Sequence, residues 1–166
     1  MESSAKAAGH AVHQQLIVLP LGLFATAVAF DVVGMVTHDE RLAFASYLMI
    51  VVAVVTGLVA SVFGLIDYLA IPIGTRAKRV AVLHGAGNVV MLVLFMGSAF
   101  LRAGSHDNVP GTPAFLLALV ALVIAAGTGW LGGELVGRLG VGVDDDADLD
   151  APARLTTRIS IPRGPR

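Results

Sequence analysis

Four long apolar stretches, separated by short polar ones, dominate the pattern of this chain. Each reaches the roughly 20 residues that a helix needs to cross the hydrocarbon core of a bilayer. A lone strand would leave its backbone amides unsatisfied in lipid, so the pattern predicts membrane-spanning helices. We expect these helices at about residues 15–36, 44–69, 80–101 and 113–135.

The polar stretches between these helices are short and contain helix breakers. They read "THDER", "IPIGTRAK" and "RAGSHDNVPGTP". Proline and glycine end the helices, and short connections make successive helices antiparallel neighbours. The first apolar stretch is too long for a cleaved signal peptide and lacks a strongly basic start, so we interpret it as a retained helix. The predicted fold is an all-α integral membrane protein, a four-transmembrane-helix up-and-down bundle with short loops.

Composition narrows the choice of chemistry. The chain is 56% hydrophobic and 14% charged, with a mean hydropathy of +0.82, which no soluble domain of this size can hide. The absence of cysteine excludes disulfides, iron-sulfur clusters and thiolate zinc, and leaves histidine and carboxylate as the strong ligands. Neither a Gly-x-Ser-x-Gly motif nor a phosphate loop occurs. A non-enzymatic role is favoured, and neither a nucleic acid nor a soluble substrate is expected.

The distribution of Lys and Arg predicts the orientation. The loops on one side hold only Arg41 and Arg102, whereas the side with both termini holds most of the cations. The positive-inside rule therefore places both termini in the cytoplasm. The basic stretch after the second helix is expected to contact anionic lipid through Arg76, Lys78 and Arg79.

Three regions follow from this topology. Residues 1–14 form a cytoplasmic N-terminal segment, 15–139 the membrane domain, and 140–166 a cytoplasmic tail. The tail is acidic and then rich in arginine and proline, so we expect it to be extended or disordered unless a partner orders it. Within the helices, small residues at four-residue spacing favour close contact; they are Gly57 with Ser61, Ala60 with Gly64, and Ala125 with Gly129 and Gly133.

Polar residues inside the predicted helices fall in one layer near the cytoplasmic face. Counting along each helix puts one polar residue from every helix at this depth: His13, Asp67, His84 and Glu134. Asn88 shares the face of His84. Ionisable groups in a membrane are costly unless they are paired, so we predict that the four are in mutual contact. We also expect Asp67 to pair with Arg76 or Arg79, and place Asp31 and His38 near the opposite face.

Several motifs in this order resemble a known family. They are "GHAVHQQL", "GLIDYLAIPIGTRAKRVAVLHGAGN" and "WLGGELVGRLGVGV", and together they resemble the bacterial membrane proteins catalogued as domain of unknown function 2231, from about Gly9 to Val143. The family pattern begins Gly-His-Pro-x-His-Pro, so Ala11 and Gln14 depart from it while His10 and His13 are kept. Near the end, Gly137, Arg138 and Leu139 stand where the family often has Tyr-Arg-His. The resemblance implies a four-helix membrane domain in the inner membrane of a bacterium. Relatives are similar to domains joined to, or encoded near, redox proteins.

Three interpretations of the histidines remain open. His13, or His10, with His84 could hold a haem b between two helices that point the same way. His10, His13 and His84, with or without Asp67, could hold a divalent metal. Alternatively, the histidines fasten the bundle by hydrogen bonds, and the protein is a scaffold or accessory subunit of a larger membrane complex, such as an electron-transfer complex. The last is preferred, because histidines at a helix entrance are more often anchors than ligands and no domain outside the membrane could hold a substrate.

Overall fold

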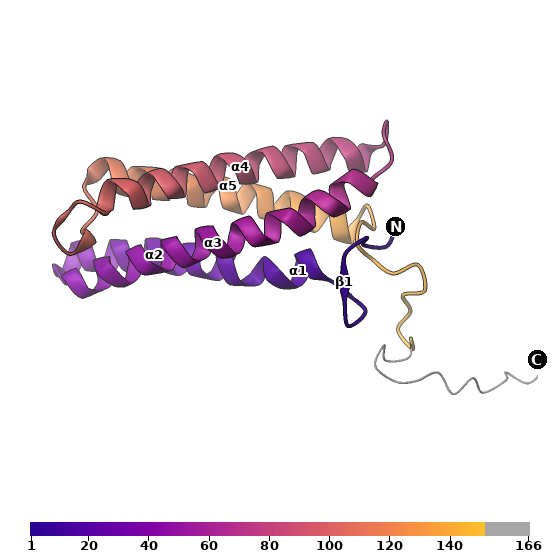
Figure 1. Cartoon of the computed structure of the whole chain (residues 1–166), viewed down its shortest axis with the longest axis horizontal. Coiled ribbons are helices and arrows are strands. Elements are labelled where there is room, and N and C mark those ends of the chain that lie inside the picture. Colours follow the sequence, from indigo (N-terminus) through magenta and orange to yellow (C-terminus); the bar gives the residue numbers. More distant parts are fainter. Residues whose placement is uncertain (152–166) are drawn as a thin grey trace, which may run out of the picture.

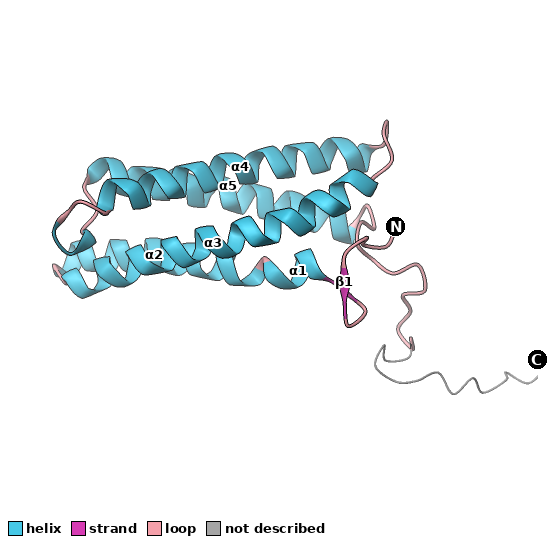
Figure 2. Ribbon diagram, viewed as in Figure 1, coloured by secondary structure: helices cyan, strands magenta, loops and turns pink. Residues whose placement is uncertain are grey.

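The computed structural model describes residues 1–151, and almost all of its regular structure is helical (Figures 1 and 2). A two-stranded hairpin near the N-terminus precedes the helices, and the first two helices are separated only by Ile17. The elements are β1 (Lys6–Ala7), β2 (His10–Ala11), α1 (Val12–Leu16), α2 (Val18–Thr37), α3 (Glu40–Ala70), α4 (Arg76–Arg102), the short 3-10 helix η1 (His106–Asn108) and α5 (Thr112–Gly137). Helices α1 and α2 together form the first span. The part of the predicted tail at 152–166 lies outside the described residues.

The helices begin and end at residues suited to those positions. Asp39 accepts a hydrogen bond from the amide of Arg41 at the start of α3, and the Thr75 hydroxyl accepts one from the amide of Lys78 at the start of α4. Such N-caps satisfy amides that have no partner within the helix. Because these caps lie in the polar stretches, α3 and α4 each begin four residues before the start predicted from the apolar pattern.

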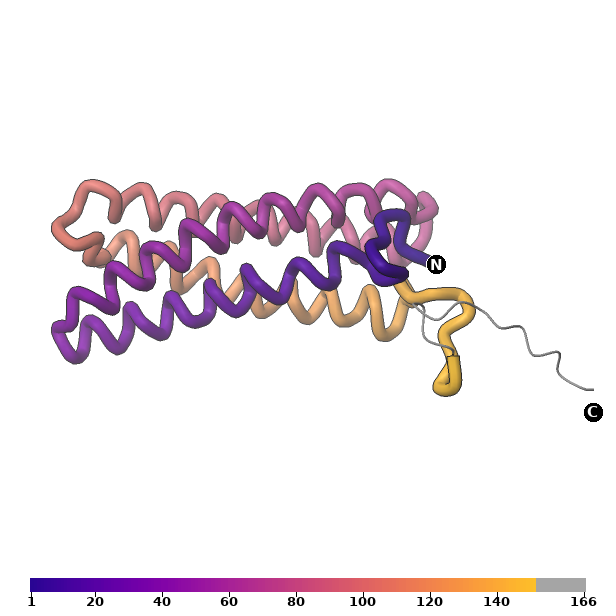
Figure 3. Tube along the Cα trace, turned by 60° about the horizontal axis from the view of Figure 1, so that its bottom comes forward, coloured from indigo at the N-terminus to yellow at the C-terminus, as the bar shows by residue number. Residues whose placement is uncertain are grey.

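The long helices run along one axis with successive helices antiparallel, which confirms the predicted four-helix bundle (Figures 1 and 3). The connections after α2 and α4 lie at one end, which we call the loop end. Both the N-terminus and the segment after α5 lie at the other, which we call the termini end. Helices α1 to α3 form a first hairpin, and α4 with α5 a second. Each hairpin packs more extensively within itself than against the other.

The middle of the bundle is apolar and tightly packed. Phe24 of α2 stacks on Phe95 of α4, with ring centroids 3.9 Å apart and an interplanar angle of 11°. Small residues let the helices approach: an added Cβ at Gly57 would lie 3.1 Å from Leu92. The predicted contact stripe on α5 is only partly right, because the equivalent atom at Gly129 or Gly133 would meet nothing within 4 Å.

The outside of the bundle is apolar as well. Large hydrophobic side chains such as Phe100 and Trp130 are 82% and 70% exposed. The four spans in the described residues are each long and apolar enough to cross a membrane. Exposed apolar surface on this scale requires a lipid environment. The molecule is a multi-pass membrane protein.

At the termini end, the first residues are fastened to the segment that follows α5. The Lys6 ammonium lies 2.5 Å from a carboxylate oxygen of Asp144 and 2.6 Å from one of Glu2. The hydrogen bond to Asp144, with that to Glu2, raises the pKa of Lys6 above its ordinary value. The start of the acidic tail therefore lies against the N-terminal segment rather than extending freely.

Candidate functional site

His13 of α1 is held against α3. Its Nδ1 lies 2.8 Å from the carbonyl oxygen of Ala60. The ring also lies on Gly64, where an added Cβ would be 2.8 Å from the Cε1 of His13. A carbonyl oxygen can only accept, so Nδ1 carries a proton, and in the neutral ring Nε2 carries a lone pair. In the described part of the chain, no hydrogen bond to that Nε2 occurs.

His84 of α4 is held against α5 in the same manner. Its Nδ1 lies 2.9 Å from the carbonyl oxygen of Thr128, and an added Cβ at Gly132 would be 3.2 Å from its Cε1. The same reasoning assigns the proton to Nδ1 and the lone pair to Nε2. One difference separates the two histidines: the amide nitrogen of Asn88 lies 3.0 Å from Nε2 of His84.

The two imidazoles meet where the hairpins face each other. Their ring centroids are 6.4 Å apart and their planes are nearly perpendicular, at 88°. Both rings are half-buried, and each is fixed by a carbonyl of its own hairpin. A backbone carbonyl on Nδ1 is the usual partner that orients a histidine whose Nε2 binds a metal.

Asp67 and Glu134 do not join this pair. Asp67 accepts hydrogen bonds from the Ser3 hydroxyl at 2.8 and 3.0 Å and from the Ser4 amide at 2.8 Å. The expected pairing of Asp67 with Arg76 or Arg79 is wrong, because Arg76 binds Glu134 instead, at 2.6 Å. The predicted four-residue cluster is thus divided into three separate groups at one depth.

The remaining basic and histidine residues of this end are peripheral. Lys78 lies 3.7 Å from the centre of the Tyr68 ring and donates to the Tyr68 carbonyl, while Arg79 is exposed. His10 is exposed in β2 and lies outside the histidine pair. It lines a shallow cavity of about 330 Å³ together with Gly9, Ala11, Gln14, Gln15, Gly142 and Asp144.

A buried ion pair near the loop end was not anticipated. The guanidinium of Arg102 binds both carboxylate oxygens of Asp31, at 2.8 and 2.6 Å, with both side chains 0% exposed. Arg102 also donates to the hydroxyls of Ser46 and Ser98, each at 3.2 Å, and Ser98 donates to the Ala114 carbonyl at 2.7 Å. The assignment of Arg102 to a loop is therefore wrong: it is the last residue of α4 and lies inside the bundle.

The ion pair and the hydrogen bonds around it form a network that connects all four spans. Asp31 belongs to α2, Ser46 to α3, Arg102 to α4, and the carbonyl of Ala114 to α5. A buried arginine is satisfied only when its charge and its N–H groups are partnered. The signal for the pair was available in the sequence, since an acidic and a basic residue lie at similar depth at the ends of two parallel helices.

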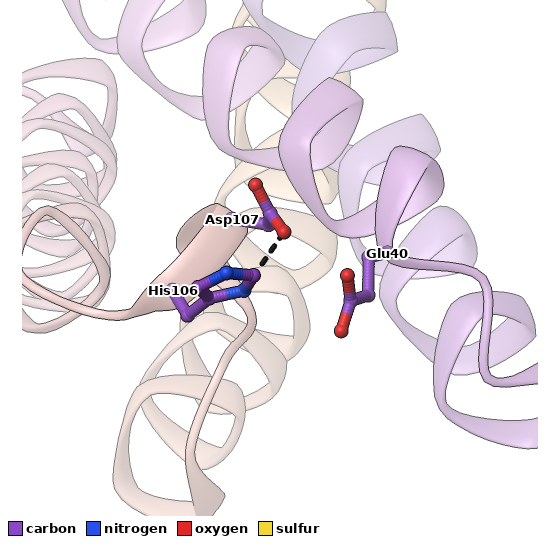
Figure 4. A group of neighbouring side chains, drawn as sticks. All are labelled: Glu40, His106 and Asp107. Carbon is purple, nitrogen blue, oxygen red and sulfur yellow. Dashed lines mark ion pairs between the residues drawn. The ribbon is translucent and has the colours of Figure 1, made fainter.

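Three ionisable residues at the loop end also lie close together (Figure 4). Glu40 of α3, His106 and Asp107 each offer an atom within 4.8 Å of the others, and Nδ1 of His106 lies 2.8 Å from a carboxylate oxygen of Asp107. All three are exposed. Exposed groups of this kind occur commonly without a metal, so they do not define a site.

Comparison with known proteins gives the family and no function. No curated protein and no solved structure is significantly similar to this chain. A family model described as "Predicted membrane protein (DUF2231)" matches residues 9–145, which include the histidine pair, the Arg102 network and all four spans. The chain belongs to this family of predicted membrane proteins.

Proposed function

We propose that the protein binds one haem b between its hairpins, with His13 and His84 as the two axial ligands, and acts as a membrane electron carrier. The observation that carries this proposal is the separation of the two rings. A metal bound at about 2.0–2.1 Å by one nitrogen of each of two opposed imidazoles holds their ring centres about 6.3 Å apart. The observed 6.4 Å is close to that separation.

The number of ligands favours haem over a bare ion. Structural zinc takes four protein ligands and catalytic zinc three. Among the described residues, no third His, Cys, Asp or Glu lies close enough to His13 and His84 to form a three-ligand site with them. A porphyrin supplies four nitrogens itself and leaves two axial positions, which is the number of histidines available.

The surrounding residues would position the ligands. The Ala60 and Thr128 carbonyls hold the two rings by Nδ1, and Gly64 and Gly132 let each ring lie close to the neighbouring helix. The haem supplies a one-electron redox change when bound. For Nε2 of His84 to bind iron, the Asn88 amide must turn away from it, and side chains beside the two rings must move aside to admit the porphyrin.

An accessory or scaffold role is the second candidate, and the Asn88 contact favours it. Asn88 already partners Nε2 of His84. Every buried side-chain polar atom in the described residues also has a partner. In this alternative the imidazoles fasten the two hairpins within a larger membrane complex, and no pigment binds.

Absorbance spectra of the detergent-purified protein, oxidised and dithionite-reduced, separate the two. Haem binding predicts a sharp reduced band and about one haem per chain by pyridine haemochrome assay. His13→Ala and His84→Ala should each remove the band while the helical content remains. His10→Ala is the matched control and should keep it. Protein from its native membrane that shows no band, even after haem is supplied during expression, would refute the haem proposal and favour the accessory role.

A further inference from the structure

The first span of each hairpin, α1 with α2 in one and α4 in the other, has corresponding residues at a constant offset in sequence. Moving 71 residues along the chain takes His13 to His84, Phe24 to Phe95 and Asp31 to Arg102. Each of these residues contacts its own counterpart: the imidazoles face each other, the phenyl rings stack, and the charges pair. Three successive layers of the bundle are thus built from equivalent positions.

The second helices match at an offset of 68 residues. Six buried positions of α3 correspond to six buried positions of α5. Because buried positions define the face by which a helix packs, the two helices present the same face to the bundle. The matched positions are Ser46 and Ala114, Ile50 and Ala118, Ala53 and Ala121, Gly57 and Ala125, Ala60 and Thr128, and Asp67 and Leu135.

The contacts around the histidines repeat as well. In each hairpin, the histidine of the first helix bonds to a carbonyl of the second helix and lies on a glycine one turn further along. The offsets relate these partners too: Ala60 to Thr128 and Gly64 to Gly132. Sequence position, burial and hydrogen bonding are three separate observations, and all three relate the first hairpin to the second.

We infer that the chain is two copies of one helical hairpin packed about a pseudo-two-fold axis along the bundle. Both first helices start at the termini end, so the repeat is parallel rather than inverted. The buried face of each hairpin is an interaction surface, and the partner that fits it is a second hairpin of the same kind.

The charges at the equivalent positions 31 and 102 make this pairing selective. Two first hairpins facing each other would oppose two carboxylates, and two second hairpins would oppose two guanidinium groups. Like charges in a buried site repel and stay unpaired. Only a first hairpin against a second satisfies both, so Asp31 and Arg102 favour the native pairing and disfavour the alternatives.

The hydroxyls around the arginine show where the copies diverged. Ser98 and Ser46 bind Arg102, while their equivalents, Ala27 and Ala114, carry no hydroxyl. All four positions are buried, at 0 to 2% exposure. If the two-fold relation holds, the whole network can therefore be moved to the opposite side of the axis.

A mirror variant of the full chain tests this. It combines Asp31→Arg, Arg102→Asp, Ala27→Ser, Ser98→Ala, Ala114→Ser and Ser46→Ala, and is compared with Asp31→Arg alone and Arg102→Asp alone. The measurements are the yield of monodisperse protein after detergent extraction and the melting temperature. Both single variants should lose most of the yield, and the mirror variant should recover at least half of what they lose.

Two controls sharpen the result. The charge exchange without the serine changes should recover less than the mirror variant, because the new arginine lacks its hydroxyl partners. The four serine and alanine changes with the native charges should be worse than the native chain. A mirror variant that folds no better than Asp31→Arg alone would overturn the inference. The outcome does not depend on whether haem is bound.

Discussion

Replacing Asp31 by asparagine should lower the free energy of unfolding by about 2–4 kcal/mol. Removing one partner of a buried ion pair costs about 3–5 kcal/mol, because the other charge is left uncompensated. Asparagine retains one oxygen that accepts a hydrogen bond from Arg102, so the expected cost is about 1 kcal/mol below that range, at about 2–4 kcal/mol. With both side chains 0% exposed, little solvent screening reduces it.

Titration with SDS in mixed micelles, followed by far-ultraviolet circular dichroism, measures this change. Glu40→Gln is the matched control, an exposed carboxyl at the same end, and should change stability by less than about 0.5 kcal/mol. Asp31→Leu combined with Arg102→Met should recover most of the loss, since well-packed apolar pairs often replace buried ion pairs without cost. A value for Asp31→Asn within about 0.5 kcal/mol of the native protein would refute the reasoning.

Three further outcomes are expected. Gly64→Ala should displace the imidazole that lies on it and lower the melting temperature, whereas Gly133→Ala, where an added Cβ meets nothing within 4 Å, should be neutral or stabilising by up to about 1 kcal/mol. Asp67→Ala should cost about 1–3 kcal/mol in a detergent unfolding titration, because the Ser4 amide loses its acceptor; an unchanged midpoint would contradict this. Reporter fusions at residue 105 and at the C-terminus should report opposite sides of the membrane, and identical reports would exclude the proposed orientation.

Hydropathy was sufficient for the fold because lipid imposes a length and an apolar composition on every span. The depth of the polar layer also followed from counting residues along each helix. The partners of these polar residues could not be predicted in this way, because counting gives a height along the bundle and not the direction in which a side chain points around its helix. His13 and His84 face each other, whereas Asp67, at a similar depth, turns to Ser3 instead.

The internal repeat was hidden for a related reason. Lipid-facing positions accept any apolar residue, so they diverge freely and dilute the similarity between the hairpins. The matched residues that remain are spaced 7 or 11 apart along α1, α2 and α4, as with His13, Phe24 and Asp31. Asp31 and Arg102 differ in charge sign, so a comparison by residue similarity scores the most informative pair as a mismatch.

The contacts made by the first residues determine how late in synthesis the fold can be completed. Ser3 can reach Asp67 once α3 has emerged, but Lys6 must wait for Asp144, which lies 138 residues later. At about 5–20 residues per second, that wait lasts about 7–28 s. During it, the N-terminal segment can bind Asp67 through Ser3 but cannot bind Asp144 through Lys6. A ribosome that stalls after the last span but before residue 144 would therefore leave a chain with its helices made but without the contact between Lys6 and the segment after α5.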